Sequence, residues 1–260
     1  MIFIKLGGSL ITDKRESEHF NAETMARAAR EIANARMANP ELGLLLGHGS
    51  GSYGHVAAAK YDTANGVRTG AEWRGFAEVA VVARRLNNLV IEALYAEGLP
   101  IFPVSPSASA HCVDGELLNM DDIRIQAALE RGLIPLVHGD VAFDDVRGGT
   151  IISTEAVFFY LAEVLRPTQI LLLGETEGVY DATGQIFPKI TPGNFTQVAA
   201  ALGGSGGVDV TGGMASKVRT MLALTQRLSG LQIYIFGGNA PGQIEAALMG
   251  ESPGTLISAE

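Results

Sequence analysis

Short apolar runs that end near glycine alternate with longer stretches of helical periodicity, and this alternation constrains the fold more than any other feature. The apolar runs are Ile2–Leu6, Leu42–Leu46, Ile101–Val104, Leu133–Val137, Gln169–Leu173 and Gln232–Phe236. The helical stretches between or after them are Ala22–Met37, Ala71–Glu97, Asp121–Arg131, Thr154–Leu165, Met214–Leu228 and Gln243–Met249. Strands separated by helices indicate an open, mostly parallel sheet with helices on both faces. Val141–Phe143 and Thr150–Ile152 flank a turn and predict one hairpin.

Composition excludes several classes of protein. Of 260 residues, 47% are hydrophobic and 18% charged, which excludes a disordered chain. The net charge of −9 disfavours general binding of nucleic acid or of an anionic membrane. A single cysteine, Cys112, excludes an internal disulfide and a cysteine zinc cage, so a cytoplasmic location is expected. No apolar run approaches the roughly 18 residues of a membrane span.

Glycines follow the predicted strands at the edge of the sheet where ligands of such folds bind. The segment Gly49–Gly54 matches a dinucleotide fingerprint, but no strand ending in an acidic residue follows about 20 residues later. No lysine follows a glycine, which excludes the P-loop, and the protein-kinase motif His-Arg-Asp is absent. The glycines therefore belong to another kind of site.

Three lysines accompany these glycine turns. Lys5 lies within the first strand, Lys14 follows soon after it, and Lys217 lies one turn into the helix that Thr211-Gly212-Gly213 opens. Glycine lets backbone N–H groups approach phosphate oxygens, and lysine supplies a mobile positive charge. A lysine buried in a strand needs an anionic partner. Singly, each turn is also compatible with an ordinary connection carrying a solvated lysine; together, the three indicate a phosphate site.

Several segments resemble the amino acid kinase superfamily, in order, over nearly the whole chain. They are Lys5-Leu6-Gly7-Gly8-Ser9, Glu175-Thr176-Glu177-Gly178-Val179-Tyr180, and Val210-Thr211-Gly212-Gly213-Met214 followed by Lys217. Two other segments resemble the isopentenyl phosphate kinases of that superfamily. These are His48-Gly49-Ser50-Gly51-Ser52-Tyr53-Gly54-His55, and His138-Gly139-Asp140 with Pro106-Ser107-Ala108 upstream.

The resemblance implies an α/β fold, a three-layer αβα sandwich with a mostly parallel open sheet, in one domain over residues 1–260. Residues 1–165 would form the acceptor-binding lobe and residues 166–260 the nucleotide-binding lobe. The implied activity is transfer of the γ-phosphoryl group of ATP to isopentenyl phosphate, which gives isopentenyl diphosphate for isoprenoid biosynthesis. Also implied are a homodimer and Mg²⁺, the latter coordinated by phosphate oxygens and water with no protein ligand expected.

The resemblance also assigns roles to residues, because joining two anions requires cations and N–H donors. Two unit charges 4 Å apart at an effective dielectric near 20 repel by about 4 kcal/mol. Lys5 and Lys217 are assigned to the β- and γ-phosphates, and Lys14 to the transferring group. The residues expected at ATP are Lys5, Gly7, Gly8, Ser9, Gly51, Glu175, Gly213 and Lys217.

On the acceptor side, His55 is predicted to donate a hydrogen bond to the acceptor phosphate. A phosphate dianion is already a nucleophile and needs no general base. Ser50 and Gly139 are expected beside the same phosphate. Asp140 is predicted to hold Lys5 or Lys14 in place, the alternative being a turn aspartate, whereas His48 and His138 are predicted to be structural.

The apolar tail of the acceptor needs a hydrophobic slot. The residues predicted to line it follow one side of the long helix: Trp73, Phe76, Val79 and Ala80. A stripe of this kind equally describes plain core or a dimer interface.

Two departures from the superfamily pattern concern the nucleotide side. Glu175 and Glu177 stand where aspartates are usual, and Ser153-Thr154-Glu155 stands where Ser-Gly-Asp is frequent. The alternatives left open are a superfamily enzyme acting on another small phosphorylated or phosphonate acceptor, and a nucleotide-binding protein without catalysis.

Overall fold

An eight-stranded sheet forms the centre of the computed structural model, which describes residues 1–13, 15–16, 18–203 and 213–260, with only the backbone at 55–57 and 59. From edge to edge its strands are β10 (Lys189–Ile190), β12 (Thr255–Ile257), β11 (Gln232–Gly237), β9 (Gln169–Gly174), β1 (Ile2–Leu6), β2 (Leu44–His48), β6 (Ile134–His138) and β3 (Ile101–Pro103). All neighbours run parallel except β11 and β12. The predicted open, mostly parallel sheet is confirmed.

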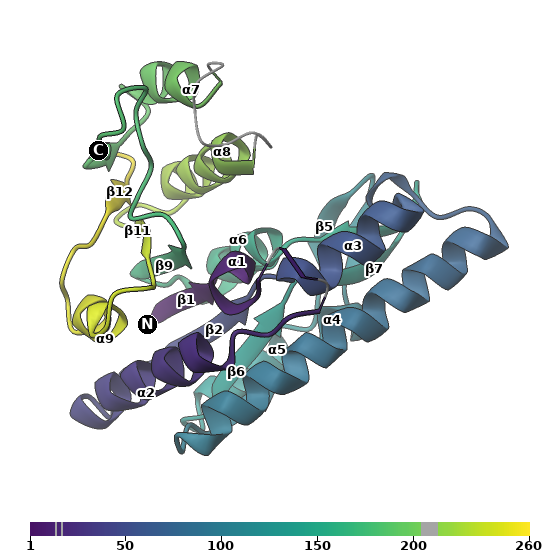
Figure 1. Cartoon of the computed structure of the whole chain (residues 1–260), viewed down its shortest axis with the longest axis horizontal. Helices are drawn as coiled ribbons and strands as arrows, with labels where there is room; N and C mark the ends of the chain where they lie inside the picture. Colours follow the sequence, from purple (N-terminus) through teal and green to yellow (C-terminus); the bar gives the residue numbers. More distant parts are fainter. Residues whose placement is uncertain (14, 17, 204–212) are drawn as a thin grey trace.

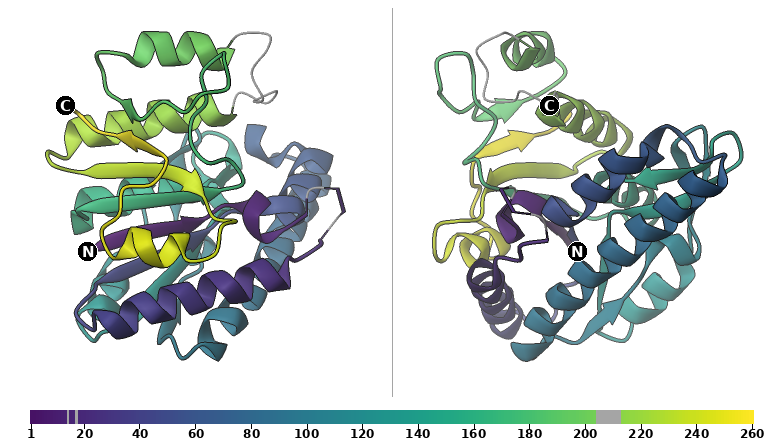
Figure 2. Two further views of the ribbon diagram at one scale, coloured as in Figure 1. Left: turned by 60° about the vertical axis from the view of Figure 1, so that its left-hand side comes forward. Right: turned by 45° about the vertical axis from the view of Figure 1, so that its right-hand side comes forward.

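Helices cover both faces of this sheet, because successive side chains of each buried strand point to opposite faces. On one face, Ile4 and Leu46 pack against α2 (Ala22–Ala38), α4 (Gly70–Ala96) and α9 (Gln243–Leu248). On the other, Phe3 and Leu45 pack against α5 (Ile123–Leu129), α6 (Thr154–Leu165), α7 (Phe195–Gly203) and α8 (Gly213–Arg227). Figure 1 and Figure 2 show the resulting three layers. Lys5 alternates with Ile4 and so shares the face of Phe3, which α6 and α8 cover.

A second, four-stranded sheet lies beside the long helix α4, with the order β5 (Glu116–Asn119), β4 (His111–Val113), β7 (Asp140–Asp144) and β8 (Gly148–Ile152). The predicted hairpin is its β7–β8 pair. Thr69 and Glu72 form a capping box at the start of α4, which fixes where this predicted helix begins. Among the described residues, no helix is long and apolar enough to cross a membrane.

Two short helices differ from the sequence-based expectation. Residues expected to form only glycine turns begin α1 (Gly8–Ile11) and α3 (Gly51–Tyr61). The 3-10 turns η1 (Thr63–Asn65) and η2 (Pro106–Ala108) complete the connections near them. The glycine-rich segment 203–207, a composition typical of a flexible loop, lies after Gly203 outside the described residues. The division into an acceptor lobe and a nucleotide lobe stays a prediction.

Candidate active site

A cleft of about 1220 Å³ opens where the central parallel strands end. Leu6 pairs in register with His48 on one side and with Leu173 on the other, and His48 pairs with His138. The chain segments that follow these four strands therefore emerge side by side. They line the cleft together with the first turns of α6 and α8.

Two glycine turns pack backbone against backbone at one side of the cleft. A methyl group added at Gly8 would overlap the backbone nitrogen of Gly51, and one added at Gly49 would lie 2.7 Å from the nitrogen of Gly8. Gly51 has a φ of +49°, the left-handed region that glycine adopts without strain. The N–H groups of Gly8, Ser9 and Gly51 have no acceptor among the described residues. These donors are therefore available to an anion in the cleft.

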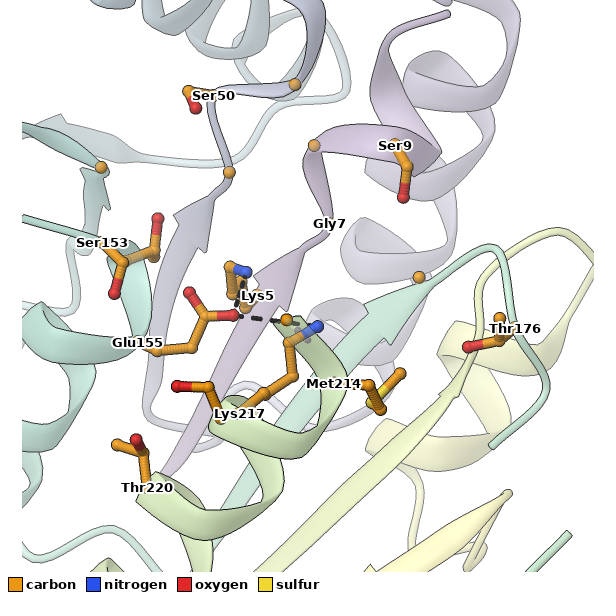
Figure 3. Close-up of a pocket in the computed structure, with 18 of the residues that line it drawn as sticks. Lys5, Gly7, Ser9, Ser50, Ser153, Glu155, Thr176, Met214, Lys217 and Thr220 are labelled. Atoms are coloured by element: carbon orange, nitrogen blue, oxygen red, sulfur yellow. Dashed lines mark hydrogen bonds and ion pairs between the residues drawn. The ribbon is translucent and has the colours of Figure 1, made fainter. Parts of the chain in front are cut away.

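Two lysines from different elements converge on one carboxylate (Figure 3). The Lys5 ammonium donates a 2.6 Å hydrogen bond to Oε1 of Glu155, and the Lys217 ammonium lies 3.9 Å from the same oxygen. Lys5 is buried, with 8% exposure. Glu155 lies in the first turn of α6, and Lys217 in the second turn of α8. The site thus gathers two positive charges before any substrate is present.

Local packing explains why Glu155 reaches Lys5. Gly47 is the register partner of Lys5 on β2. A methyl group at Gly47 would lie 2.7 Å from the Phe158 ring and 2.8 Å from Thr154, so glycine lets α6 approach the sheet. Burial raises the pKa of the Glu155 carboxyl, but the charges of Lys5 and Lys217 outweigh burial, and the net pKa is lowered. Glu155 is therefore an anion at neutral pH.

The partner of Lys5 corrects one prediction. Asp140 accepts hydrogen bonds from the backbone N–H groups of Ser107, at 3.1 Å, and Val141, at 2.9 Å. It therefore orders the η2 segment, and Glu155 takes the place beside Lys5 that was predicted for Asp140. The alternative pairing, of Asp140 with Lys14, lies outside the described residues. Asp140 still lines the cleft.

Two buried histidines stack beneath the cleft, with ring centroids 5.4 Å apart. The nitrogens of His48 lie 3.0 Å from Oδ1 of Asn87 and 3.1 Å from the Gly49 carbonyl oxygen. Burial, and then the neighbouring His138, lower the pKa of His48 to about 4. His138 contacts the Gly139 carbonyl oxygen at 2.9 Å, and its Nε2 has no hydrogen-bond partner among the described residues. These contacts are compatible with the structural role predicted for both histidines.

The predicted apolar stripe on α4 divides into two parts. Val79 lines the cleft, where Ala58, Ala83 and Ile151 accompany it. Phe76 and Ala80 pack behind Val79. Trp73 instead joins Phe76 and Phe143 in an aromatic group, with ring centroids 5.2 to 5.9 Å apart. The apolar end of the cleft is thus built mainly from small aliphatic side chains.

The other predicted residues are accounted for as follows. Those that line the cleft are Lys5, Gly7, Gly8, Ser9, Ser50, Gly51, Gly139, Glu175, Gly213 and Lys217. Lys14 and Thr211-Gly212 lie outside the described residues, and at His55 only the backbone, within α3, is described. Glu155 was not among the predicted site residues, although the superfamily pattern had already pointed to Ser153-Thr154-Glu155 on the nucleotide side. Without that pattern, an acidic residue two positions after the helix cap Ser153 is an ordinary sign of a helix start.

Known proteins resemble this chain over its full length. The amino acid kinase family matches residues 1–237. The isopentenyl phosphate kinase of Methanocaldococcus jannaschii is 34% identical, covering 99% of this chain and 98% of the relative. That of Haloferax volcanii is 37% identical, covering 100% and 99%. A solved X-ray structure of isopentenyl phosphate kinase superposes with a TM-score of 0.84 at 32% identity, covering 99% of this chain and 100% of the other. The chain therefore belongs to the amino acid kinase family and, within it, to the isopentenyl phosphate kinases.

Proposed function

We propose that this chain transfers the γ-phosphoryl group of ATP to isopentenyl phosphate and releases isopentenyl diphosphate and ADP. The observation that carries the proposal is the pair of lysines held on Glu155 in a cleft that also has an apolar end. Two positive charges suit the meeting of two phosphates, and an apolar end suits a hydrocarbon tail. The full-length relatives named isopentenyl phosphate kinase support the same reaction.

On the nucleotide side, Lys5 and Lys217 would neutralise the β- and γ-phosphates of ATP, with Lys14 assisting at the transferring group. The N–H groups of Gly8, Ser9 and Gly51, which have no acceptor within the described part of the chain, would donate to phosphate oxygens. Gly7 keeps its turn close to β9, because its N–H donates to the Leu173 carbonyl oxygen at 2.8 Å. Glu175 and Gly213, which also line the cleft, would contact the nucleotide.

On the acceptor side, His55, on α3, would donate a hydrogen bond to the acceptor phosphate, with Ser50 and Gly139 beside it. The tail would lie along Val79, Ala83 and Ile151. Each buried methylene contributes about 0.8 kcal/mol, so the slot would discriminate tail length modestly. Trp73 and Phe76 would shape this end of the cleft from behind Val79.

Mg²⁺ is proposed to enter with ATP. Among the described residues, no group of three His, Cys, Asp or Glu side chains is placed to hold a metal ion. An ion coordinated mainly by phosphate oxygens and water would neutralise charge on the transferring group. A homodimer is likewise proposed, and sedimentation equilibrium at micromolar concentration tests it.

The function is tested by ADP release from Mg-ATP with and without isopentenyl phosphate. Wild-type protein is expected to show a large acceptor-dependent rate, and His55→Ala to lower it about a hundredfold or more. His111→Ala is the matched control, because His111 pairs with Asp145 on the four-stranded sheet and does not line the cleft. An unchanged rate in His55→Ala would remove His55 from the chemistry. Absence of any acceptor-dependent rate would overturn the proposed function.

A further inference from the structure

One buried hydroxyl connects the two glycine turns of the cleft. Thr12 is 2% exposed and lies directly after α1. Its Oγ1 donates a 2.7 Å hydrogen bond to the Gly8 carbonyl oxygen. The same Oγ1 accepts a 2.9 Å hydrogen bond from the backbone N–H of Ser52, in the first turn of α3. A single side chain thus bonds to the turn after β1 and to the turn after β2.

The hydrogen bond from the Ser52 N–H to Thr12 takes the place of the side-chain N-cap that α3 lacks. Ser50 stands at the N-cap position, but its side chain makes no capping hydrogen bond. The first N–H groups of a helix need an acceptor, and a hydroxyl at the N-cap is the usual one. Thr12 supplies it from a different element. The start of α3 is therefore fixed relative to α1 and not only relative to its own chain.

The glycines make this spacing rigid. Gly8 and Gly51 touch through their backbones, and a methyl group at Gly51 would overlap both Thr12 Oγ1 and the Gly8 carbonyl oxygen. Backbone atoms cannot move apart as a flexible side chain can. With the hydroxyl bonded on both sides, the two turns keep one separation.

We propose that Thr12 is a positioning residue that fixes the distance between the donor and the acceptor phosphate. The inference rests on the proposed function, in which Gly8 and Ser9 bind ATP and Ser50 and His55 bind the acceptor, while Gly51, where the two turns touch, also donates to ATP. Transfer between two bound phosphates requires near-contact alignment, and a misplacement of about 1 Å can cost about a hundredfold in rate. Thr12 touches neither substrate in this arrangement and acts through the two turns.

This role predicts a specific kinetic signature. The N–H groups of both turns, together with Lys5 and Lys217, are retained when the hydroxyl is lost, so each substrate alone still binds. What is lost is their mutual alignment. Thr12→Val, which keeps the shape and removes the hydroxyl, is therefore expected to lower kcat about ten- to a hundredfold. The dissociation constants of ATP and of isopentenyl phosphate, measured singly by calorimetry, are expected to change less than threefold.

The decisive probe is a bisubstrate analogue, an adenosine tetraphosphate esterified with the isopentenyl group, because it must occupy both turns at once. Its affinity is expected to fall at least tenfold in Thr12→Val. Thr12→Ser retains the hydroxyl and is expected to stay within threefold of wild type in every measurement. Thr225→Val is the matched control. That buried threonine hydroxyl also bonds to a backbone carbonyl, of Leu222, but within α8 and outside the cleft.

The inference is overturned if Thr12→Val keeps kcat within twofold, if Thr12→Ser loses as much as Thr12→Val, or if analogue and single substrates weaken equally. A wild type without acceptor-dependent ADP release would instead refute the proposed function, so the two failures are distinguishable. Should Thr12→Val fail to fold, Thr12→Cys replaces it, because a thiol is a weak donor and acceptor of similar size. An intermediate loss of kcat and of analogue affinity is then expected, and wild-type values would refute the role.

Discussion

At the scale of single residues, Glu155 presents an apparent conflict, since a carboxylate in a phosphate site repels the substrate. Its Oε1 is shared by the ammonium groups of Lys5 and Lys217. Without that anion, two cations, one of them buried, would face each other in the empty cleft and move apart. We therefore expect Glu155→Gln to lower kcat about tenfold or more while leaving the KM for ATP unchanged or smaller, as steady-state kinetics would measure.

Two comparisons make the Glu155 prediction specific. Glu163 lies two turns further along α6 and pairs with Arg227 away from the cleft, so Glu163→Gln should behave as wild type. Because the charges of Lys5 and Lys217 hold the pKa of Glu155 below its usual range, its carboxylate stays ionised at neutral pH and on either side of it. The ratio of wild-type to Glu155→Gln activity should therefore be constant from pH 6 to pH 9. A ratio that collapses toward one within this range would contradict the assignment.

The burial of His48 leads to a prediction about protein stability rather than about the reaction rate. Its pKa is lowered from 6.5 to about 4 by burial and by His138, so the folded protein keeps the ring neutral while the unfolded chain takes up a proton. Well above pH 6.5 His48 is unprotonated in both states and contributes nothing to the pH dependence of stability. As pH falls from 6.5 to 4, proton binding at His48 stabilises the unfolded chain. The free energy of unfolding should therefore decrease by roughly 3 kcal/mol.

Urea unfolding at pH 6.5 and pH 4.5 measures most of this loss. Carboxylates also titrate in that range, so the informative quantity is the difference between wild type and His48→Gln, whose stability should depend on pH less steeply. His19→Gln changes an exposed ring and should follow the wild-type slope. Equal slopes for wild type and His48→Gln would show that His48 is not held neutral.

At the scale of helices and strands, hydrophobic periodicity and helix-capping residues were sufficient to predict the long elements. The predicted bounds of α6 agree with the structure, because Ser153 caps the helix and apolar residues continue to Leu165. Strands of two to four residues, such as β10 and β5, are too short to show a hydrophobic alternation in the sequence. Helix α3 was missed because its stability comes from other elements. Thr12 caps it, and Gly75 of α4 makes room for Tyr61 at its end.

The same distinction applies to the elements that build the site. A lysine within a buried strand predicts an anionic partner, so Lys5 could be identified from the sequence. The identity of that partner could not be predicted from the sequence, because it depends on which helix covers the face of the sheet that Lys5 shares with Phe3. Only the packing of α6 over Gly47 selects Glu155 rather than Asp140. Gly8 and Gly51 were predicted from the glycine turns that contain them. Their prediction needed no information about how the helices pack.

At the scale of the whole molecule, the two halves of the chain share one sheet. Strands up to residue 165 and strands after it meet where β1 pairs with β9 along its full length. Both hydrophobic clusters take residues from the two halves, such as Ile4 with Leu171, and Phe3 with Ile170. Glu31 of α2 also accepts a 2.9 Å hydrogen bond from the N–H of Ile244, at the start of α9. Separating the halves would expose apolar surface on both.

We therefore expect the halves to unfold together, although each is large enough to be a domain. Trp73 is the single tryptophan and reports on the first half. Tyr234→Trp in a Trp73→Phe background moves the reporter into β11 of the second half. Fluorescence midpoints in urea, each compared with far-UV circular dichroism of the same protein, should coincide for both. A β11 reporter whose transition is separated from the dichroism would mean that the β1–β9 contact is too weak to couple the halves, so each would have a stability of its own.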